Sequence, residues 1–124
     1  MSTDALWRVL ERASADDLEG ALWASMVDAH GPSAAATAHM DQGMRGRMLS
    51  GIFDLLFLEE AALDALMDFE VPNHRSYGAT AEGYEALFAG LTAVLGAYAE
   101  GDEETAALKA RCDHLLNAIL RRNP

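Results

Sequence analysis

The chain has little cysteine, little proline and no long uninterrupted apolar run. Each of these shortages excludes certain classes of protein. Its sole thiol, Cys112, excludes an intrachain disulfide and suits a reducing compartment. The most apolar stretch, residues 51–67, is broken by four carboxylates and does not predict a membrane-spanning helix. The first 20 residues carry acids throughout and lack the apolar core of a secretory signal. We therefore expect a cytoplasmic protein with no membrane partner.

Basic residues are also scarce, with 9 Lys and Arg against 20 Asp and Glu, and the formal net charge is −11. A charge of this sign is repelled by the nucleic-acid backbone and by anionic membrane surfaces, so we expect no nucleic-acid partner. An acidic surface is instead compatible with a basic protein partner.

Alanine and leucine are abundant, and hydrophobic residues make up 51% of the 124 residues. This length and composition predict one folded domain over residues 1–124. No alternating run of β-branched residues occurs, so we expect an all-α fold. The predicted helices cover about residues 3–13 and 14–29, a long segment that bends or stops near residues 57–60, and two closing helices. The expected N-caps are Ser14 (with Asp17), Thr80 and Asp102.

Apolar residues recur at helical spacing along these segments. The long segment carries Met40, Met44, Met48, Ile52 and Leu56, and Leu49 widens the same face. The closing helices carry Tyr84, Leu87, Phe88, Leu91, Leu95 and Tyr98, then Leu108, Cys112, Leu115, Leu116 and Ile119. Pro72 disfavours helical geometry at Val71, so we expect the preceding helix to end near Phe69 or Glu70.

Few side chains stand out as chemical groups. The four histidines are His30, His39, His74 and His114. None of them has a second histidine four residues away, or a cysteine at the spacing of a zinc site. Glu60, Asp64 and Asp68 form an i, i+4 row that we interpret as a solvated face. The methionine row is more typical of core than of a soft ligand pocket, and Cys112 of a small buried side chain.

The segment from about Asp41 to Ile119, roughly two-thirds of the chain, resembles the second half of a bacterial globin. The likeness rests on MRGRMLSGIFDLL, then NHRSYGATAEGYEALFAGLTAVLG, then the helix from Asp102 to Arg121. The motif H-x-x-Y-G, with a tyrosine ten residues after the histidine, is similar to single-domain bacterial haemoglobins and to the haem domain of flavohaemoglobins.

This resemblance implies a globin-like helical fold that is shortened between the second helix and the distal helix. It implies that His74 is the proximal ligand of the iron of haem b, and that Tyr84 lies near it. The pocket walls would be apolar. The other residues that would contact the cofactor are Met44, Met48, Leu49, Trp23, Tyr77, Leu87 and Phe88, with Leu22 as an alternative to Trp23. Donors to a bound gas would be Gln42, His39 or the Trp23 indole.

Two functions follow as hypotheses. The first is a small haem-binding globin that binds a diatomic gas (O2, NO or CO) or transfers electrons through iron held by His74. Turnover would be that of a globin-type dioxygenase with an external reductase, and no catalytic side chain is assigned. The second is a haem-free globin-like sensor or adaptor that acts through protein contacts or binds an apolar ligand. The lack of an aromatic residue after Pro32 favours this second function. The sequence does not identify the gas. It is also compatible with a homodimer.

Overall fold

The computed structural model describes residues 3–13, 17–18, 20–25 and 42–123. Its helices are α1 (Asp4–Ala13), α3 (Gln42–Leu55), α4 (Glu60–Ser76), α5 (Ala81–Gly96) and α6 (Gly101–Arg122). Residues 20–25 are also helical, and the described part of the chain contains no strand. The predicted all-α class is therefore confirmed. The predicted stop near residues 57–60 is confirmed too, because it separates α3 from α4.

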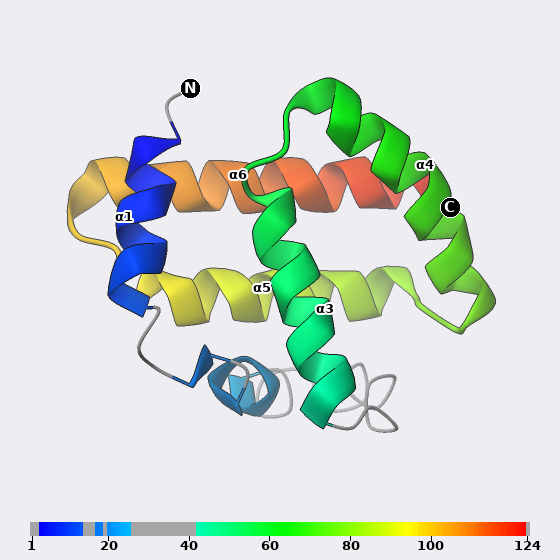
Figure 1. Ribbon diagram of the computed structural model, residues 1–124, viewed down its shortest axis with the longest axis horizontal. Helices are drawn as coiled ribbons and strands as arrows, with labels where there is room; N and C mark the ends of the chain where they lie inside the picture. Colours follow the sequence, from blue (N-terminus) through cyan, green and yellow to red (C-terminus); the bar gives the residue numbers. More distant parts are fainter. Residues whose placement is uncertain (1–2, 14–16, 19, 26–41, 124) are drawn as a thin grey trace.

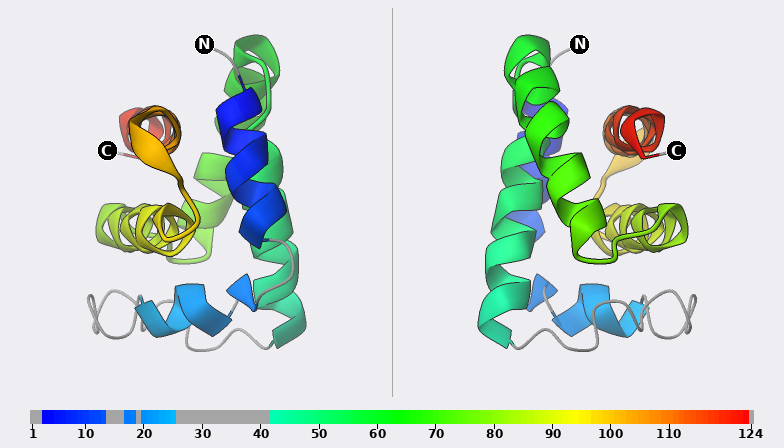
Figure 2. Two further views of the ribbon diagram at one scale, coloured as in Figure 1. Left: turned by 90° about the vertical axis from the view of Figure 1, so that its left-hand side faces the viewer. Right: turned by 90° about the vertical axis from the view of Figure 1, so that its right-hand side faces the viewer.

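The helices are arranged around an antiparallel pair. α5 and α6 lie side by side, and α1 and α3 cross them on one face (Figure 1 and Figure 2). α4 lies at the edge of the pair and connects the end of α3 to the start of α5. Close backbone contacts join α5 with α6, and α1 and α4 with α6, whereas α3 has few such contacts with any helix. The helix α3 is therefore packed against the others mainly through its long side chains.

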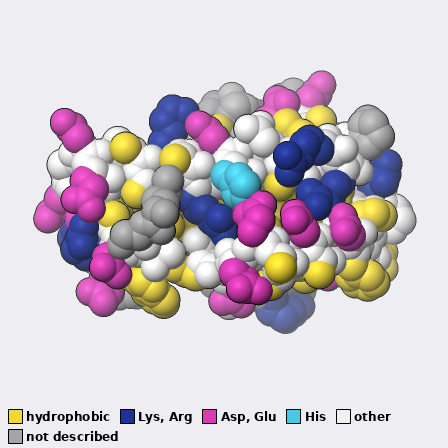
Figure 3. Space-filling model, turned by 90° about the horizontal axis from the view of Figure 1, so that it is seen from above, with side chains coloured by type: hydrophobic (Ala, Val, Ile, Leu, Met, Phe, Trp, Pro, Cys, Tyr) yellow, Lys and Arg dark blue, Asp and Glu magenta, His cyan; other side chains and the backbone are white. Residues whose placement is uncertain are grey.

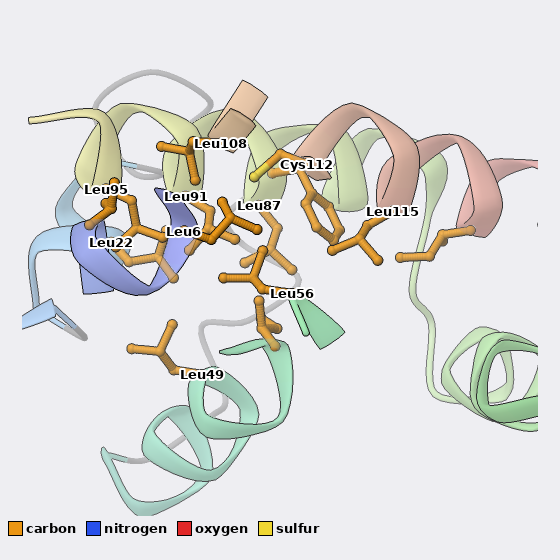
Figure 4. Close-up of a cluster of buried hydrophobic side chains, with 14 of the residues drawn as sticks. Leu6, Leu22, Leu49, Leu56, Leu87, Leu91, Leu95, Leu108, Cys112 and Leu115 are labelled. Carbon is orange, nitrogen blue, oxygen red and sulfur yellow. The ribbon is translucent and has the colours of Figure 1, made fainter. Parts of the chain in front are cut away.

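The core is built mainly from leucine, and Figure 4 shows leucines of α1, α3, α5 and α6 meeting in one cluster. The large side chains with less than 2% of their surface exposed are Val9, Leu22, Leu56, Leu63, Leu91, Leu95, Leu108, Cys112 and Leu115. The stripes predicted for α5 and α6 supply most of them. Cys112 is the small buried side chain that its sequence context predicts.

The predicted end of α4 is wrong, because the helix continues through Pro72 to Ser76. A proline inside a helix removes one backbone hydrogen bond and costs about 3 kcal/mol. Here the buried row of Leu63 and Met67 extends beyond the predicted end to Val71, directly before the proline, and Val71 is only 2% exposed. Burying an aliphatic side chain contributes about 1.5–3 kcal/mol, so packing of this row offsets the lost bond. The consequence is nearly two additional helical turns, which carry His74.

The helix starts agree only partly with prediction. Thr80 caps α5, since its hydroxyl accepts a hydrogen bond from the Gly83 N–H at 3.1 Å. Asp102 is not a cap, because α6 already begins at Gly101, whose φ is +79°. Instead, the Glu104 carboxylate accepts a hydrogen bond from the Glu100 N–H at 2.9 Å and so links the start of α6 to its first turn. Ser14 lies outside the described residues.

α1 is attached to α6 by a partly buried ion-pair cluster. The Glu104 carboxylate, only 8% exposed, accepts hydrogen bonds from the guanidinium groups of Arg8 and Arg12. Arg12 also donates to the Tyr98 carbonyl at 2.9 Å, which adds the end of α5 to the cluster. Charged groups buried in this way are stable only when paired and hydrogen-bonded, and here both conditions hold.

Arg111 of α6 holds the corner between α3 and α4. One Nη of Arg111 donates to the carbonyls of Leu55 and Leu58, each at 2.8 Å. These carbonyls belong to the end of α3 and to the connection that follows it, where helical partners are lacking. The corner is therefore fixed to the middle of α6.

Glu60, Asp64 and Asp68 form the solvated face that the sequence predicts, with 57%, 48% and 70% of their side chains exposed. Each carboxylate also has a partner on α6. Glu60 lies 3.0 Å from His114, and Asp64 and Asp68 lie 3.1 and 2.8 Å from Arg122. Figure 3 shows acidic and basic side chains interspersed on the face seen from above. These pairs are largely exposed, so each contributes at most about 1 kcal/mol. They set the register of α4 against α6.

Candidate functional site

An apolar cavity of about 670 Å³ lies between α3, α4 and the start of α5. Its volume is within the range of about 300–1,000 Å³ that is typical of small-molecule and cofactor pockets. α3 contributes Met44, Arg47, Met48, Gly51, Ile52 and Leu55. α4 contributes Leu66, Met67, Glu70, Val71 and His74, and the following turn adds Tyr77 to Thr80. α5 contributes Gly83, Tyr84, Leu87 and Phe88, and Ile119 of α6 completes the wall.

His74 reaches this cavity because α4 does not end at Pro72. Met67, Glu70 and His74 are spaced by three and four residues, so a continuous helix presents them on one face. All three line the cavity. Had α4 ended at Glu70, nothing in the sequence would have fixed the direction of His74.

One ring nitrogen of His74 is held by the backbone. Nδ1 lies 2.7 Å from the carbonyl oxygen of Glu70, one turn earlier in α4. A carbonyl oxygen can only accept, so Nδ1 carries the proton of this bond. In the neutral ring the lone pair is then on Nε2. His74 thus combines an oriented imidazole, an available nitrogen and a position in an apolar wall.

Tyr84 lies in the same wall, on the first turn of α5. Burial raises the pKa of its hydroxyl above the ordinary value of 10.0; the Arg75 cation opposes this increase, and the Glu70 carboxylate adds to it. Tyr84 therefore remains a neutral hydroxyl at physiological pH. Its titration is sensitive to the same Glu70 that contacts His74.

The Tyr-Gly pair of the motif has a structural role in the turn after α4. Gly78 has φ of +95°, in the left-handed region that glycine adopts without strain. Its N–H donates to the Arg75 carbonyl at 3.0 Å, and the Ala79 N–H donates to the His74 carbonyl at 3.1 Å. The turn ends α4 at Ser76, two residues after His74, and directs the chain into α5.

Large apolar side chains remain exposed around the cavity, and we call them its mouth. They are Met44, Leu66 and Tyr77, with 38%, 37% and 82% of their surface exposed. Single exposed apolar residues are common on proteins, but a group around a cavity indicates a binding site. A ligand larger than the cavity interior would cover this surface.

Most of the residues predicted to contact a cofactor come together here. His74, Met44, Met48, Tyr77, Tyr84, Leu87 and Phe88 line the cavity. Leu49 and Trp23 are not in its walls. Both are buried in the core, and Arg45 lies over the Trp23 ring at 5.6 Å. Leu22 is buried as well. His30, His39, Met40 and the Gln42 side chain lie outside the described part of the molecule.

Sequence reasoning missed two charged residues of the cavity, Arg47 and Glu70. Arg47 follows Met44 by three residues, and Glu70 precedes His74 by four. Helical spacing could have found both, but the expected end of α4 placed Glu70 at a terminus. Among the described residues, no group of three or more His, Cys, Asp or Glu side chains could hold a metal ion. None of the described helices is long and apolar enough to cross a membrane.

Comparison with models of known protein families, with curated proteins and with solved structures finds no match to this chain. The residues around the cavity are therefore the basis for inferring a function.

Proposed function

We propose that this chain is a globin-like protein that binds haem b in the cavity, with His74 as axial ligand to the iron. The observation that carries the proposal is a histidine in the wall of an apolar cavity of about 670 Å³, with its Nδ1 bound to the Glu70 carbonyl at 2.7 Å. A metal-bound histidine usually donates a hydrogen bond from its second ring N–H to such an acceptor. This bond fixes the tautomer and the orientation of the imidazole.

The other walls suit the same cofactor. A porphyrin has two broad apolar faces and a polar edge. Met48 and Ile52 of α3 and Leu87 and Phe88 of α5 supply apolar surface. Arg47, in the same wall of α3, supplies a cation for a carboxylate at the polar edge. The exposed apolar surface at the mouth would be covered by a planar ligand of this size.

Bound haem would supply iron with one coordination position for a diatomic gas such as O2, NO or CO. His74 would bind the iron through Nε2, and the hydrogen bond of Nδ1–H to the Glu70 carbonyl holds the orientation of the ring. Met44 and Met48 give the α3 wall flexible thioether side chains that carry no hydrogen-bond donor. Turnover of a gas would require electrons from an external reductase.

The test is the absorption spectrum of the chain expressed with haem supplied, compared with His74→Ala. We expect a Soret band in the wild type that shifts when carbon monoxide is added after reduction. His74→Ala should lose or shift the band. His114→Ala is the matched control, because that histidine lies outside the cavity, 3.0 Å from Glu60, and its variant should retain the wild-type spectrum.

A wild-type protein that remains helical but colourless would overturn haem binding. The cavity would then be available to a different apolar ligand, as in the haem-free alternative. A band that is equally strong and unshifted in His74→Ala would overturn the assignment of the axial ligand.

A further inference from the structure

The side chain of Glu70 lies beside the same nitrogen that its backbone binds. Glu70 Oε2 is 3.4 Å from His74 Nδ1, while the Glu70 carbonyl oxygen is 2.7 Å from it. One residue thus presents a carbonyl and a carboxylate to a single N–H. The i, i+4 spacing on α4 brings both oxygens to the ring, and the carboxylate belongs to the cavity wall.

The two oxygens act differently. The carbonyl is within hydrogen-bond distance and fixes the ring. The carboxylate at 3.4 Å lies just beyond the usual range, so its effect on the imidazole is that of a nearby negative charge. With 38% of its side chain exposed, it is screened by water only in part. Negative charge next to Nδ1–H increases the electron density available at Nε2.

Neighbouring groups support this role for Glu70. Besides burial, the Glu70 carboxylate contributes to the raised pKa of the Tyr84 hydroxyl, while the Arg75 cation opposes it. Tyr84 and Glu70 line the same cavity as His74.

We infer that Glu70 is a positioning residue for His74, whose carboxylate strengthens Nε2 as an axial donor and stabilises ferric over ferrous iron. This inference rests on the proposed haem binding. Partners of metal-bound histidines typically change metal affinity or activity by about 10–100-fold, so a tenfold effect on the ferric/ferrous equilibrium is expected.

The test uses haem-loaded wild type, Glu70→Gln, Glu70→Asp and Glu59→Gln. The readouts are the midpoint potential and the iron–histidine stretching frequency from resonance Raman spectra. Glu70→Gln should raise the potential by about 59 mV, which is tenfold for one electron, and lower the stretching frequency. Glu70→Asp retains the charge and should lie between. Glu59→Gln removes the same charge before α4 begins, eleven residues away, and should match the wild type.

The outcomes separate the two proposals. A wild-type chain without haem overturns the proposed function, and the role of Glu70 with it. Haem-loaded variants with unchanged potential and stretching frequency overturn the role of Glu70 and leave haem binding intact. If Glu70→Gln folds but loses haem while Glu70→Asp retains it, the carboxylate is needed to hold His74, and the inference stands. If Glu70→Gln does not fold, Glu70→Ala replaces it as the variant without the charge: a wild-type potential in Glu70→Ala overturns the role.

Discussion

Near one end of the α5–α6 pair α1 lies across both helices with its apolar face buried, and toward the other end α3 and α4 stand apart around a cavity (Figure 1). We call these the packed side and the cavity side. Leu91 and Leu108 on the packed side are at most 2% exposed, whereas Met44 and Tyr77 on the cavity side are exposed at 38% and 82%. Both sides come from similar apolar stripes in the sequence. The packed side is complete by itself, and the cavity side has apolar surface that a ligand can cover.

The largest expected effect compares one side chain from each side. Leu91→Ala leaves a hole in a close-packed region, and we expect it to lower the free energy of unfolding by about 3 kcal/mol. Met48→Ala removes a partly buried side chain that borders an existing cavity, so it should cost below about 1 kcal/mol. Urea unfolding of the ligand-free protein gives both values. Equal losses would mean that the cavity side is packed in solution and would remove the distinction.

The sequence predicted the packed side well because its signal is local. Periodic leucines over residues 81–122 must be buried together, and Thr80 carries its own capping hydroxyl. The cavity side depended on longer-range effects. The helix α4 continues through Pro72 to Ser76, and the burial of Val71 directly before the proline is a tertiary effect that no local rule contains. The additional helical residues bring Glu70 and His74 onto one face. The sequence could therefore predict which residues belong to the site, but not how they are arranged in space.

The second prediction compares ion pairs at the two sides. Glu104→Gln removes the anion that binds Arg8 and Arg12 but preserves the shape and an acceptor for the Glu100 N–H. We expect a loss of about 2 kcal/mol, since the carboxylate is buried and its hydrogen bonds are charge-assisted. Asp68→Asn, in the exposed pairs between α4 and α6, should cost about 0.5 kcal/mol at most. Thermal unfolding at low and high salt measures both variants.

A large loss for Asp68→Asn together with a negligible loss for Glu104→Gln would reverse this ranking. It would mean that α4, and not α1, is the helix held to α6 by charge.

The smallest expected effect is a pH dependence on the packed side. Burial raises the pKa of the Cys112 thiol above its ordinary value of 9.0. Below pH 9.0 the thiol is protonated in both states, so its contribution to stability is fully present. Above that pH the unfolded chain loses the proton first, and stability falls as pH rises. Between pH 8 and 10 we expect the wild type to lose about 1 kcal/mol more than Cys112→Ser, measured by urea unfolding. Parallel losses would show that water reaches the thiol.

The hydrogen bonds of Arg111 have a mechanical consequence. They fix the corner where α3 ends and α4 approaches, and the two helices diverge from that corner (Figure 1). α4 is bonded to α6 a second time, through Asp64, Asp68 and Arg122, whereas α3 has few close backbone contacts with any helix. The two walls of the cavity are therefore held unequally, and its width depends on how the side chains of α3 pack more than on the position of α4.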